Sequence, residues 1–303
     1  MTTNPEAGAS RPISGLAIVD KPAGCTSHQV VGRIRRLAGT RKVGHAGTLD
    51  PMATGVLIVG VEKATRLLGY LALSDKAYEA TMRLGIGTIT DDAEGEVMTT
   101  LGAADLDEIE IEAAMARLRG DILQVPAAVS AIKINGVRSY RRVRAGESVE
   151  LSERPVTIRR FDVLGRRELQ VDGVDCVDLS VVVECSSGTY IRALARDMGA
   201  ALGVGGHLSS LRRTRVGAFT LEDAQTLEEA ERGLMIMPLE GVVGSSFTTL
   251  TVNESQAAQI RNGRRLTGVI LPDGTTALVD TAGHFLALYH QEGPDAIAAA
   301  VFV

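Results

Sequence analysis

The sequence of 303 residues contains no tryptophan, and aromatic side chains make up only 3% of it. Its three cysteines are Cys25, Cys176 and Cys185, and none belongs to a C-x-x-C pair. An odd number at such spacing argues against both a disulfide framework and a zinc site. The histidines form neither an H-x-x-x-H nor an H-E-x-x-H pattern, so we expect no bound metal.

Long apolar runs are also missing. No run approaches the ~18 residues that a membrane span needs, so we expect no contact with a membrane. Residues 1–12 lack the apolar core of a signal peptide and predict a short disordered lead-in. The hydrophobic content of 45% and charged content of 23% are ordinary for a soluble globular protein. These features predict a cytoplasmic protein.

Several motifs of common enzyme classes are absent. The chain has no G-x-x-x-x-G-K-[ST] phosphate loop, no complete G-x-G-x-x-G and no G-x-S-x-G elbow. Their absence argues against a P-loop nucleoside triphosphatase, a dinucleotide-binding enzyme and an α/β-hydrolase.

The net charge of −5 argues against a nucleic-acid partner, but the charges are segregated along the chain. Acids concentrate at residues 91–96, 105–112 and 222–231. Four clusters of basic residues contain no acid: residues 33–42, 138–144, 212–215 and 261–265. Each cluster taken alone is explained by a solvated face. Together on one surface they would form a nucleic-acid interface.

The pattern of elements is that of an α+β protein. We expect a buried strand within 15–24, ended by Lys-Pro and Gly, then a helix capped by Ser27 with Gly39 as its C-terminal stop, and a strand at 55–61. A helix is expected at 62–73, a strand at 76–85, an exposed acidic excursion over 86–97 and a helix over 105–120. Asn135-Gly136 predicts a hairpin. A strand then precedes the Ser-Ser-Gly turn at 186–188, and the following helix carries Arg192 and Arg196 on one face.

Short strands separated by Asn-Gly, Asp-Gly and Ala-Gly turns begin near residue 248. This change in the pattern of expected elements predicts a domain boundary. A catalytic domain with a central mixed or antiparallel sheet is expected over 13–248. A small β-rich domain follows over 249–303.

One loop, "VGHAGTLDPMATG" at 43–55, surrounds a single carboxylate with three glycines. Pro51 biases Asp50 toward an extended backbone, and glycines permit tight turns or close approach of another backbone. The residues alone leave two interpretations open. Asp50 either caps its own turn or is a nucleophile kept ionised by a cation, for which Arg192 is a candidate.

Two of the few aromatic residues also allow two interpretations. Tyr78 lies in an alternating strand and Tyr190 follows a turn. Each is either a core residue or a surface on which a base extruded from its helix can stack.

Four blocks of the chain resemble the bacterial TruB family of tRNA pseudouridine synthases. The G-H-x-G-T-L-D-P-x-A-T-G-x-L block is the most specific. The blocks are "GLAIVDKPAGCTSHQVV", "KVGHAGTLDPMATGVLIVGVEKATRL", "VPAAVSAIKINGVRSYRRVRAGE" and "CSSGTYIRALARDMGAALGVGGHLSSLRRTRVGAF". Together they extend over nearly the whole chain.

The resemblance implies roles for individual residues. Asp50 matches the catalytic nucleophile, Arg192 the arginine that pairs with it, and Tyr78 the residue that stacks on the flipped uracil. His45 matches a histidine that helps to extract the target nucleotide. Further substrate-binding positions are Tyr190, Leu211, Lys21 and Lys133, and RNA-backbone contacts are assigned to Arg141, Arg142, Arg212 and Arg213.

The resemblance also implies the reaction, which is isomerisation of uridine 55 in the T loop of tRNA to pseudouridine. Whether the aspartate attacks the ribose or the uracil ring, or assists elimination, is left open. No cofactor, metal or obligate protein partner is implied, and we expect a monomer. The C-terminal region resembles a PUA-type RNA-binding module. Two alternatives are a guide-RNA-dependent relative and a non-catalytic RNA-binding or RNA-folding protein.

Overall fold

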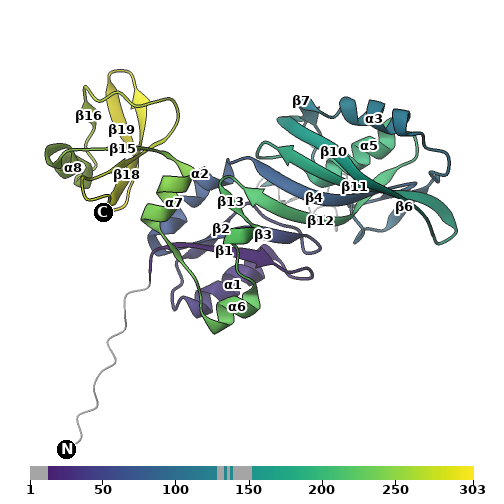
Figure 1. Cartoon of the computed structure of the whole chain (residues 1–303), viewed down its shortest axis with the longest axis horizontal. Coiled ribbons are helices and arrows are strands. Elements are labelled where there is room, and N and C mark those ends of the chain that lie inside the picture. The colour runs from purple at the N-terminus through teal and green to yellow at the C-terminus, as the bar shows by residue number, and fades with distance from the viewer. Residues whose placement is uncertain (1–12, 128–132, 135–136, 139–151) are drawn as a thin grey trace, which may run out of the picture.

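The computed structural model describes residues 13–127, 133–134, 137–138 and 152–303, with side chains for the first and last of these ranges. The predicted lead-in at 1–12 lies outside them. A mixed sheet of ten strands forms the long body of the molecule, with helices packed on it (Figure 1). The predicted α+β class with a central mixed sheet is confirmed.

The main sheet has the strand order β14-β1-β3-β12-β4-β11-β10-β7, with β2 paired to β3 and β13 to β12. Neighbours are antiparallel except β3 and β12, which run parallel where Thr54 and Gly55 face Arg212 and Arg213. The strands are β1 (Gly15–Lys21), β2 (Val43–Ala46), β3 (Thr54–Val61), β4 (Lys76–Leu84), β7 (Gly120–Gln124), β10 (Arg154–Val171), β11 (Val174–Cys185), β12 (Gly206–Val216), β13 (Phe219–Thr220) and β14 (Met237–Pro238).

Helices cover this sheet at both ends. In Figure 1, α1 and α6 lie below the β1–β3 part, and α3 and α5 lie beside β10 and β11. The apolar side of α5 packs into the core with β4 and β12. The helices are α1 (Ser27–Leu37), η1 (Glu62–Arg66), α2 (Leu68–Ala72), α3 (Glu108–Ala116), α5 (Ile191–Ala201), η2 (Leu221–Asp223), α6 (Leu227–Arg232) and α7 (Leu239–Ser246).

Two predicted helices differ in detail from the structure. The helix expected at 62–73 is divided into η1 and α2, with Leu67 between them. Thr26, rather than Ser27, caps α1, in a capping box with Gln29. The Ser27 hydroxyl donates to the Leu49 carbonyl at 3.1 Å and accepts from its N–H at 2.9 Å. This hydroxyl therefore fixes the residue that precedes Asp50.

The acidic segment 86–97 is only in part the exposed excursion that its composition predicts, with Glu94 and Glu96 exposed. It forms a hairpin of β5 (Ile86–Thr88) and β6 (Val97–Thr100), and Asp91 and Asp92 are buried. Arginines on α5 supply the opposite charge, as described below. β8 (Lys133–Ile134) pairs antiparallel with β9 (Val137–Arg138), as the predicted hairpin requires, while the Asn135-Gly136 turn lies outside the described residues.

A second, five-stranded sheet follows in the order β15-β17-β18-β19-β16. Its elements are β15 (Thr248–Thr251), α8 (Glu254–Arg261), β16 (Leu266–Thr267), β17 (Thr276–Val279), β18 (Phe285–Glu292) and β19 (Asp295–Val301). In Figure 1 this sheet stands at the end of the molecule opposite α3.

The second sheet shares apolar core with the first. Ala277, Phe285, Leu288 and Phe302 belong to one buried cluster with residues of β1 and β3. The Lys63 ammonium on η1 donates to the Phe302 carbonyl at 2.6 Å. Arg66, also on η1, donates to the Val301 carbonyl and lies over the Phe302 ring. The two sheets are thus held together by apolar contact and by cation contacts.

Gly55, the last residue of the Asp50 loop, is required to be glycine by its backbone angle and by a neighbouring strand. Its φ is +100°, and a Cβ at this position would lie 2.1 Å from the Arg213 carbonyl oxygen. The predicted close approach of another backbone is therefore present, and it is made by strand β12.

Replacing Gly55 by alanine should lower the free energy of unfolding by at least about 3 kcal/mol, because β3 and β12 must separate. Gly39→Ala is the matched control, since Gly39 also has a positive φ of +64° but has no atom within 4 Å of the added Cβ. The control should lose only about 1 kcal/mol. Urea unfolding measures both, and equal losses would contradict the steric explanation.

Candidate active site

A cavity of about 260 Å³ opens at the middle of the main sheet. Its wall is built from the loop after β2, the end of α2, β4, the turn before α5, and β12. The lining includes Asp50, Lys76, Tyr78, Tyr190, Arg192, Leu211 and Arg213. Segments far apart in sequence therefore bring the predicted residues Asp50, Tyr78, Tyr190, Arg192 and Leu211 to one space, which is large enough for a pyrimidine base.

The ion pair between Asp50 and Arg192 lies at the wall of this cavity. The Arg192 Nε is 3.0 Å from Asp50 Oδ2, and Nη2 donates to Oδ1 at 3.3 Å. Two N–H groups of one planar fork thus hold both carboxylate oxygens. The Asp50 side chain keeps 35% of its surface exposed, whereas that of Arg192 keeps 6%. The carboxylate consequently faces the opening while the guanidinium lies behind it.

A second carboxylate holds the other side of the same guanidinium. Arg192 Nη1 is 3.3 Å from Asp92 Oδ2 and donates to the Thr90 carbonyl at 2.9 Å. One turn along α5, Arg196 contacts Asp91 at 3.1 Å. The predicted common face of Arg192 and Arg196 is therefore present, and it binds the β5–β6 hairpin to α5.

Burial dominates the electrostatics of these carboxylates. Burial raises the pKa of Asp50 above its ordinary value of 3.8; Arg192 opposes the rise and Asp92 adds to it. Burial likewise raises the pKa of Asp91 to about 6 against the effect of Arg196. A carboxylate that is partly desolvated and only partly compensated is a stronger base and nucleophile than one in water.

Tyr78 and Leu211 supply the apolar part of the cavity. Tyr78 lies on β4 and Leu211 on β12, and both are nearly buried. Burial raises the pKa of the Tyr78 phenol, which favours the neutral form. A neutral aromatic ring beside an aliphatic side chain suits stacking on a base.

Tyr190 is oriented by a residue that the sequence did not suggest. The Gln124 amide accepts from the Tyr190 N–H at 2.8 Å and donates to the Tyr190 carbonyl at 3.1 Å. Gln124 is itself buried, at the end of β7. Its amide bonds the backbone N–H and carbonyl of Tyr190, the residue that caps α5 and lies two residues before Arg192. Only the tertiary fold brings β7 to this turn, so no local pattern could have predicted the contact.

Lys21, predicted to bind substrate, and Arg213, predicted to contact the RNA backbone, both bind protein carbonyls. The Lys21 ammonium is fully buried and donates to the carbonyls of Pro22, Cys25 and Pro51, at 2.9, 2.7 and 3.2 Å. It fixes the backbone after Asp50. Arg213 is also buried, with 1% exposure, and its guanidinium binds protein carbonyls instead of an exposed surface.

The remaining predicted positions are dispersed. His45 on β2 is half-buried, with its ring 5.4 Å from that of His28. Arg212 is partly exposed and pairs with Asp20 at 2.7 Å. Arg141 and Arg142 lie outside the described residues, as does the side chain of Lys133.

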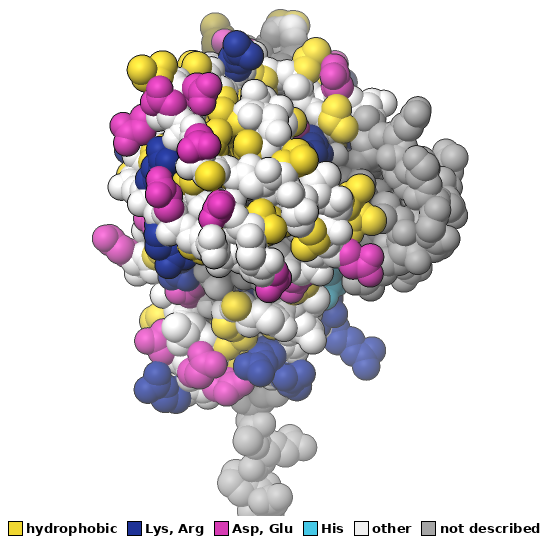
Figure 2. All heavy atoms as spheres, turned by 90° about the vertical axis from the view of Figure 1, so that its right-hand side faces the viewer, with side chains coloured by type: hydrophobic (Ala, Val, Ile, Leu, Met, Phe, Trp, Pro, Cys, Tyr) yellow, Lys and Arg dark blue, Asp and Glu magenta, His cyan; other side chains and the backbone are white. Residues whose placement is uncertain are grey.

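The basic clusters do not make a uniformly positive molecule. Arg33, Arg212, Arg261 and Arg265 each pair with an acid. At the end of the molecule that carries α3, acidic, basic and apolar side chains are interspersed over the described surface (Figure 2).

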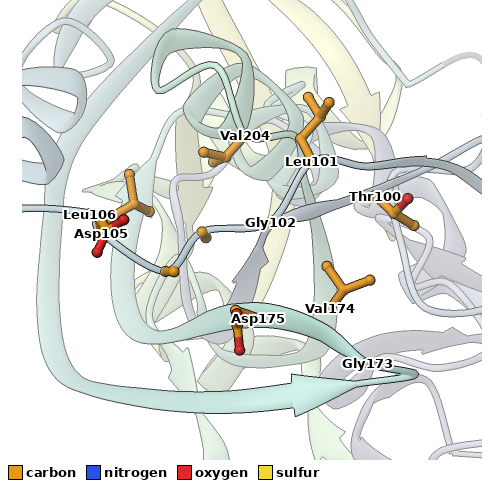
Figure 3. A pocket seen from close by; sticks show the side chains of 11 residues that line it. Thr100, Leu101, Gly102, Asp105, Leu106, Gly173, Val174, Asp175 and Val204 are labelled. Atoms are coloured by element: carbon orange, nitrogen blue, oxygen red, sulfur yellow. The ribbon is translucent and has the colours of Figure 1, made fainter.

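A larger hollow of about 550 Å³ lies between residues 100–106, the β10–β11 turn and Val204 (Figure 3). Its only ionisable lining residues are Asp105 and Asp175. Without a cation or a paired base it offers no reaction chemistry, so the smaller cavity is the candidate active site. In the described part of the chain, no three His, Cys, Asp or Glu side chains are grouped as metal ligands, and no helix is long and apolar enough to cross a membrane.

Replacing Gln124 by alanine should lower the free energy of unfolding by about 1–3 kcal/mol, because the partly buried Tyr190 N–H loses its bond to the Gln124 amide. The Tyr190 carbonyl keeps its bond from the Leu194 N–H at 3.2 Å. Gln170→Ala is a control, since the Gln170 amide bonds the exposed side chain of Asp175. Urea unfolding compares the two variants. A Gln124 variant as stable as the control would show that water replaces the lost amide.

Comparisons with known proteins agree with this geometry. Residues 35–191 match the model of the TruB family pseudouridylate synthase (N terminal domain). Residues 192–241 match the tRNA pseudouridylate synthase B C-terminal domain, and residues 247–303 match tRNA Pseudouridine synthase II, C terminal.

Curated relatives and solved structures extend the match. The chain is 56% identical over 283 residues to the tRNA pseudouridine synthase B of Nocardia farcinica, covering 93% of this chain and 91% of that one. It is 57% identical over 282 residues to the protein of the same name from Cutibacterium acnes, covering 92% and 94%.

Two similar structures come from larger assemblies. A chain in the crystal structure of a Cbf5-Nop10-Gar1 complex matches with a TM-score of 0.70 and 29% identity, covering 100% of this chain and 90% of that one. A chain of an H/ACA RNP bound to a substrate RNA containing 2'-deoxyuridine matches with a TM-score of 0.68 and 25% identity, covering 100% and 94%. With its Asp50–Arg192 cavity and these matches along its length, this chain belongs to the TruB family of pseudouridylate synthases.

Proposed function

We propose that this chain converts uridine 55 in the T loop of tRNA into pseudouridine, with Asp50 as the nucleophile. One observation carries the assignment to this cavity: the Asp50 carboxylate is gripped by Arg192 at the wall of a space of base size. The names of the relatives give the substrate class and the reaction.

The reaction is an isomerisation and needs no external reactant. The bond between uracil N1 and ribose C1' breaks, the uracil turns within the cavity, and a bond from C5 to C1' forms. The proton on C5 leaves and N1 gains one, so atoms and electrons balance. The Asp50 carboxylate drives the cleavage, and the walls of the cavity keep the released uracil beside the ribose.

The substrate base must leave the folded T loop before it reaches Asp50. Unstacking costs a few kcal/mol, and contacts between phosphates and basic side chains offset it. Tyr78 stacks on the flipped base and Leu211 supports its other side. His45, half-buried on β2 next to exposed His28, helps to draw the nucleotide out.

The domain at 249–303 serves as a PUA-type RNA-binding module that contacts the acceptor end of tRNA. The domain at 13–248 carries out the catalysis. The protein works as a monomer in the cytoplasm, without an obligate protein partner. Sheet β15-β17-β18-β19-β16, built within residues 248–301, supports this division of the chain.

Asp50→Ala should abolish release of tritium from T-loop RNA that carries tritium at uridine C5, while the wild-type protein releases it. The C5 proton is lost only when the new C5–C1' bond forms, so its release reports turnover. Asp20→Ala is the control, because Asp20 pairs with Arg212 outside the cavity lining. Equal release by Asp50→Ala and the wild type would refute the nucleophile assignment.

The same assay separates the alternatives. An unmodified tRNA transcript with purified protein and no added RNA or protein should become fully modified. No modification under these conditions, followed by modification after a guide RNA and partner proteins are added, would favour the guide-dependent alternative. No modification under either condition would favour an RNA-folding role.

Activity should fall as the pH is lowered, and the midpoint of this fall should lie at a higher pH than the ordinary pKa of an aspartate, 3.8. The nucleophile must be ionised, and burial raises the pKa of Asp50. Asp92→Asn removes a carboxylate that contributes to this rise, so its acidic limb should move to lower pH. Single-turnover rates from pH 4 to pH 8 measure the acidic limb of the wild type and that of the Asp92→Asn variant. A variant limb displaced to higher pH would contradict the charge argument.

A further inference from the structure

Arg213 is the largest fully buried side chain of the described residues. It lies on β12, and its Nε donates to the Val56 carbonyl on β3 at 2.8 Å. Its Nη2 donates to the Gly47 carbonyl, three residues before Asp50, at 2.9 Å. On its other side β12 pairs with β4, where Arg213 faces Tyr78 in the register. One guanidinium therefore joins the strand and the loop that flank the nucleophile.

The same residue lies opposite Tyr78, its register partner across β12 and β4, and both line the cavity. Burial raises the pKa of the Tyr78 phenol, while the charge of Arg213 acts in the opposite direction. Arg213 thus contacts the Asp50 loop and lies opposite the residue proposed to stack on the base. Both of these groups line the cavity.

Arg213 makes no ion pair within 4.0 Å among the residues that the structure describes. Its neighbours on β12 differ, since Arg212 pairs with Asp20 and Arg215 with Glu184. A buried charge without a carboxylate is held only by carbonyl dipoles, and desolvating it costs several kcal/mol. A methionine of similar length would avoid that loss, so packing alone does not account for an arginine here.

Two glycines of the Asp50 loop are fitted to Arg213. A Cβ on Gly47 would lie 3.4 Å from Arg213 Nη1, and Gly47 has a φ of +74°. A Cβ on Gly55 would collide with the Arg213 backbone. The residues before and after Asp50 therefore pack closely around both the side chain and the main chain of Arg213.

Resting on the proposed function, we propose that Arg213 is a positioning residue that fixes the Asp50 loop relative to Tyr78 across the base cavity, and that it binds no RNA phosphate. The planar guanidinium has five N–H donors in a fixed arrangement, so it can hold the Val56 and Gly47 carbonyls at once while its strand faces Tyr78. The ammonium of lysine is shorter in reach and has no such fork.

Arg213→Lys should lower the single-turnover rate at saturating tRNA by about tenfold to a hundredfold, because small misplacements of reacting groups are costly. The dissociation constant for tRNA, measured by filter binding, should stay that of the wild type. Arg83→Lys is the matched control, because Arg83 lies on the same sheet, bonds Asp178 at 2.8 Å and does not line the cavity. The control should retain the wild-type rate.

Chemical rescue distinguishes positioning from general stability. Guanidinium added at millimolar concentration should restore part of the rate of Arg213→Ala, because Arg213 borders the open cavity. It should restore nothing to Asp50→Ala. If neither Arg213 variant folds, Tyr78→Phe removes only the hydroxyl and should lower the rate without changing tRNA affinity. A wild-type rate for Tyr78→Phe would then overturn the link to Tyr78.

Two results would overturn the proposal while leaving the proposed function intact. Weaker tRNA binding by Arg213→Ala, with the salt slope reduced by about one and the saturating rate unchanged, would make Arg213 a phosphate contact. If Arg213→Lys has the rate and the tRNA affinity of the wild type, Arg213 does not position the Asp50 loop. An inactive wild type, or an active Asp50→Ala, would instead refute the proposed function.

Discussion

The contact between Arg192 and Asp50 is the interaction on which the site depends. It joins a loop, a hairpin and a helix, because the same guanidinium also holds Asp92 and the Thr90 carbonyl. Burying these charges is unfavourable for each one alone and is tolerated because they satisfy one another. The geometry of the carboxylate is thus set by all three segments together. A shift in any of them changes how much of Asp50 faces the cavity.

Cations serve three different purposes in this acidic protein. Arg192 and Arg196 neutralise buried carboxylates, while Lys21 and Arg213 are bound to backbone carbonyls around the Asp50 loop. Others, such as Arg33 and Arg261, remain on the surface beside single acids. A count of basic residues along the sequence does not separate these classes. Their burial, which is a property of the folded chain, does.

Local patterns predicted the features that depend on neighbouring residues. The buried strand within 15–24, the hairpin signal of Asn135-Gly136 and the common face of Arg192 and Arg196 follow from an apolar run, turn chemistry and helical spacing. The pairing of Asp50 with Arg192 was one of two interpretations from the residues, and the family resemblance favoured it. Burial of Asp91 and Asp92 was missed, because acidic composition predicts exposure unless the opposite charge on a distant helix is known. Ser27 was misassigned as a cap, and the structural contacts of Lys21 and Gln124 were overlooked, for the same reason: each acts on a segment remote in sequence.

The contact between η1 and the last strand has a consequence for studies of truncated protein. Phe302 and Phe285 complete an apolar cluster that also contains residues of β1 and β3, and Lys63 bonds the Phe302 carbonyl. The two sheets therefore share part of one core and are expected to unfold cooperatively. A chain cut near residue 249 would expose that shared surface to water and leave Lys63 without its acceptor. Reduced activity of such a fragment would report lost folding cooperativity as well as lost contact with tRNA.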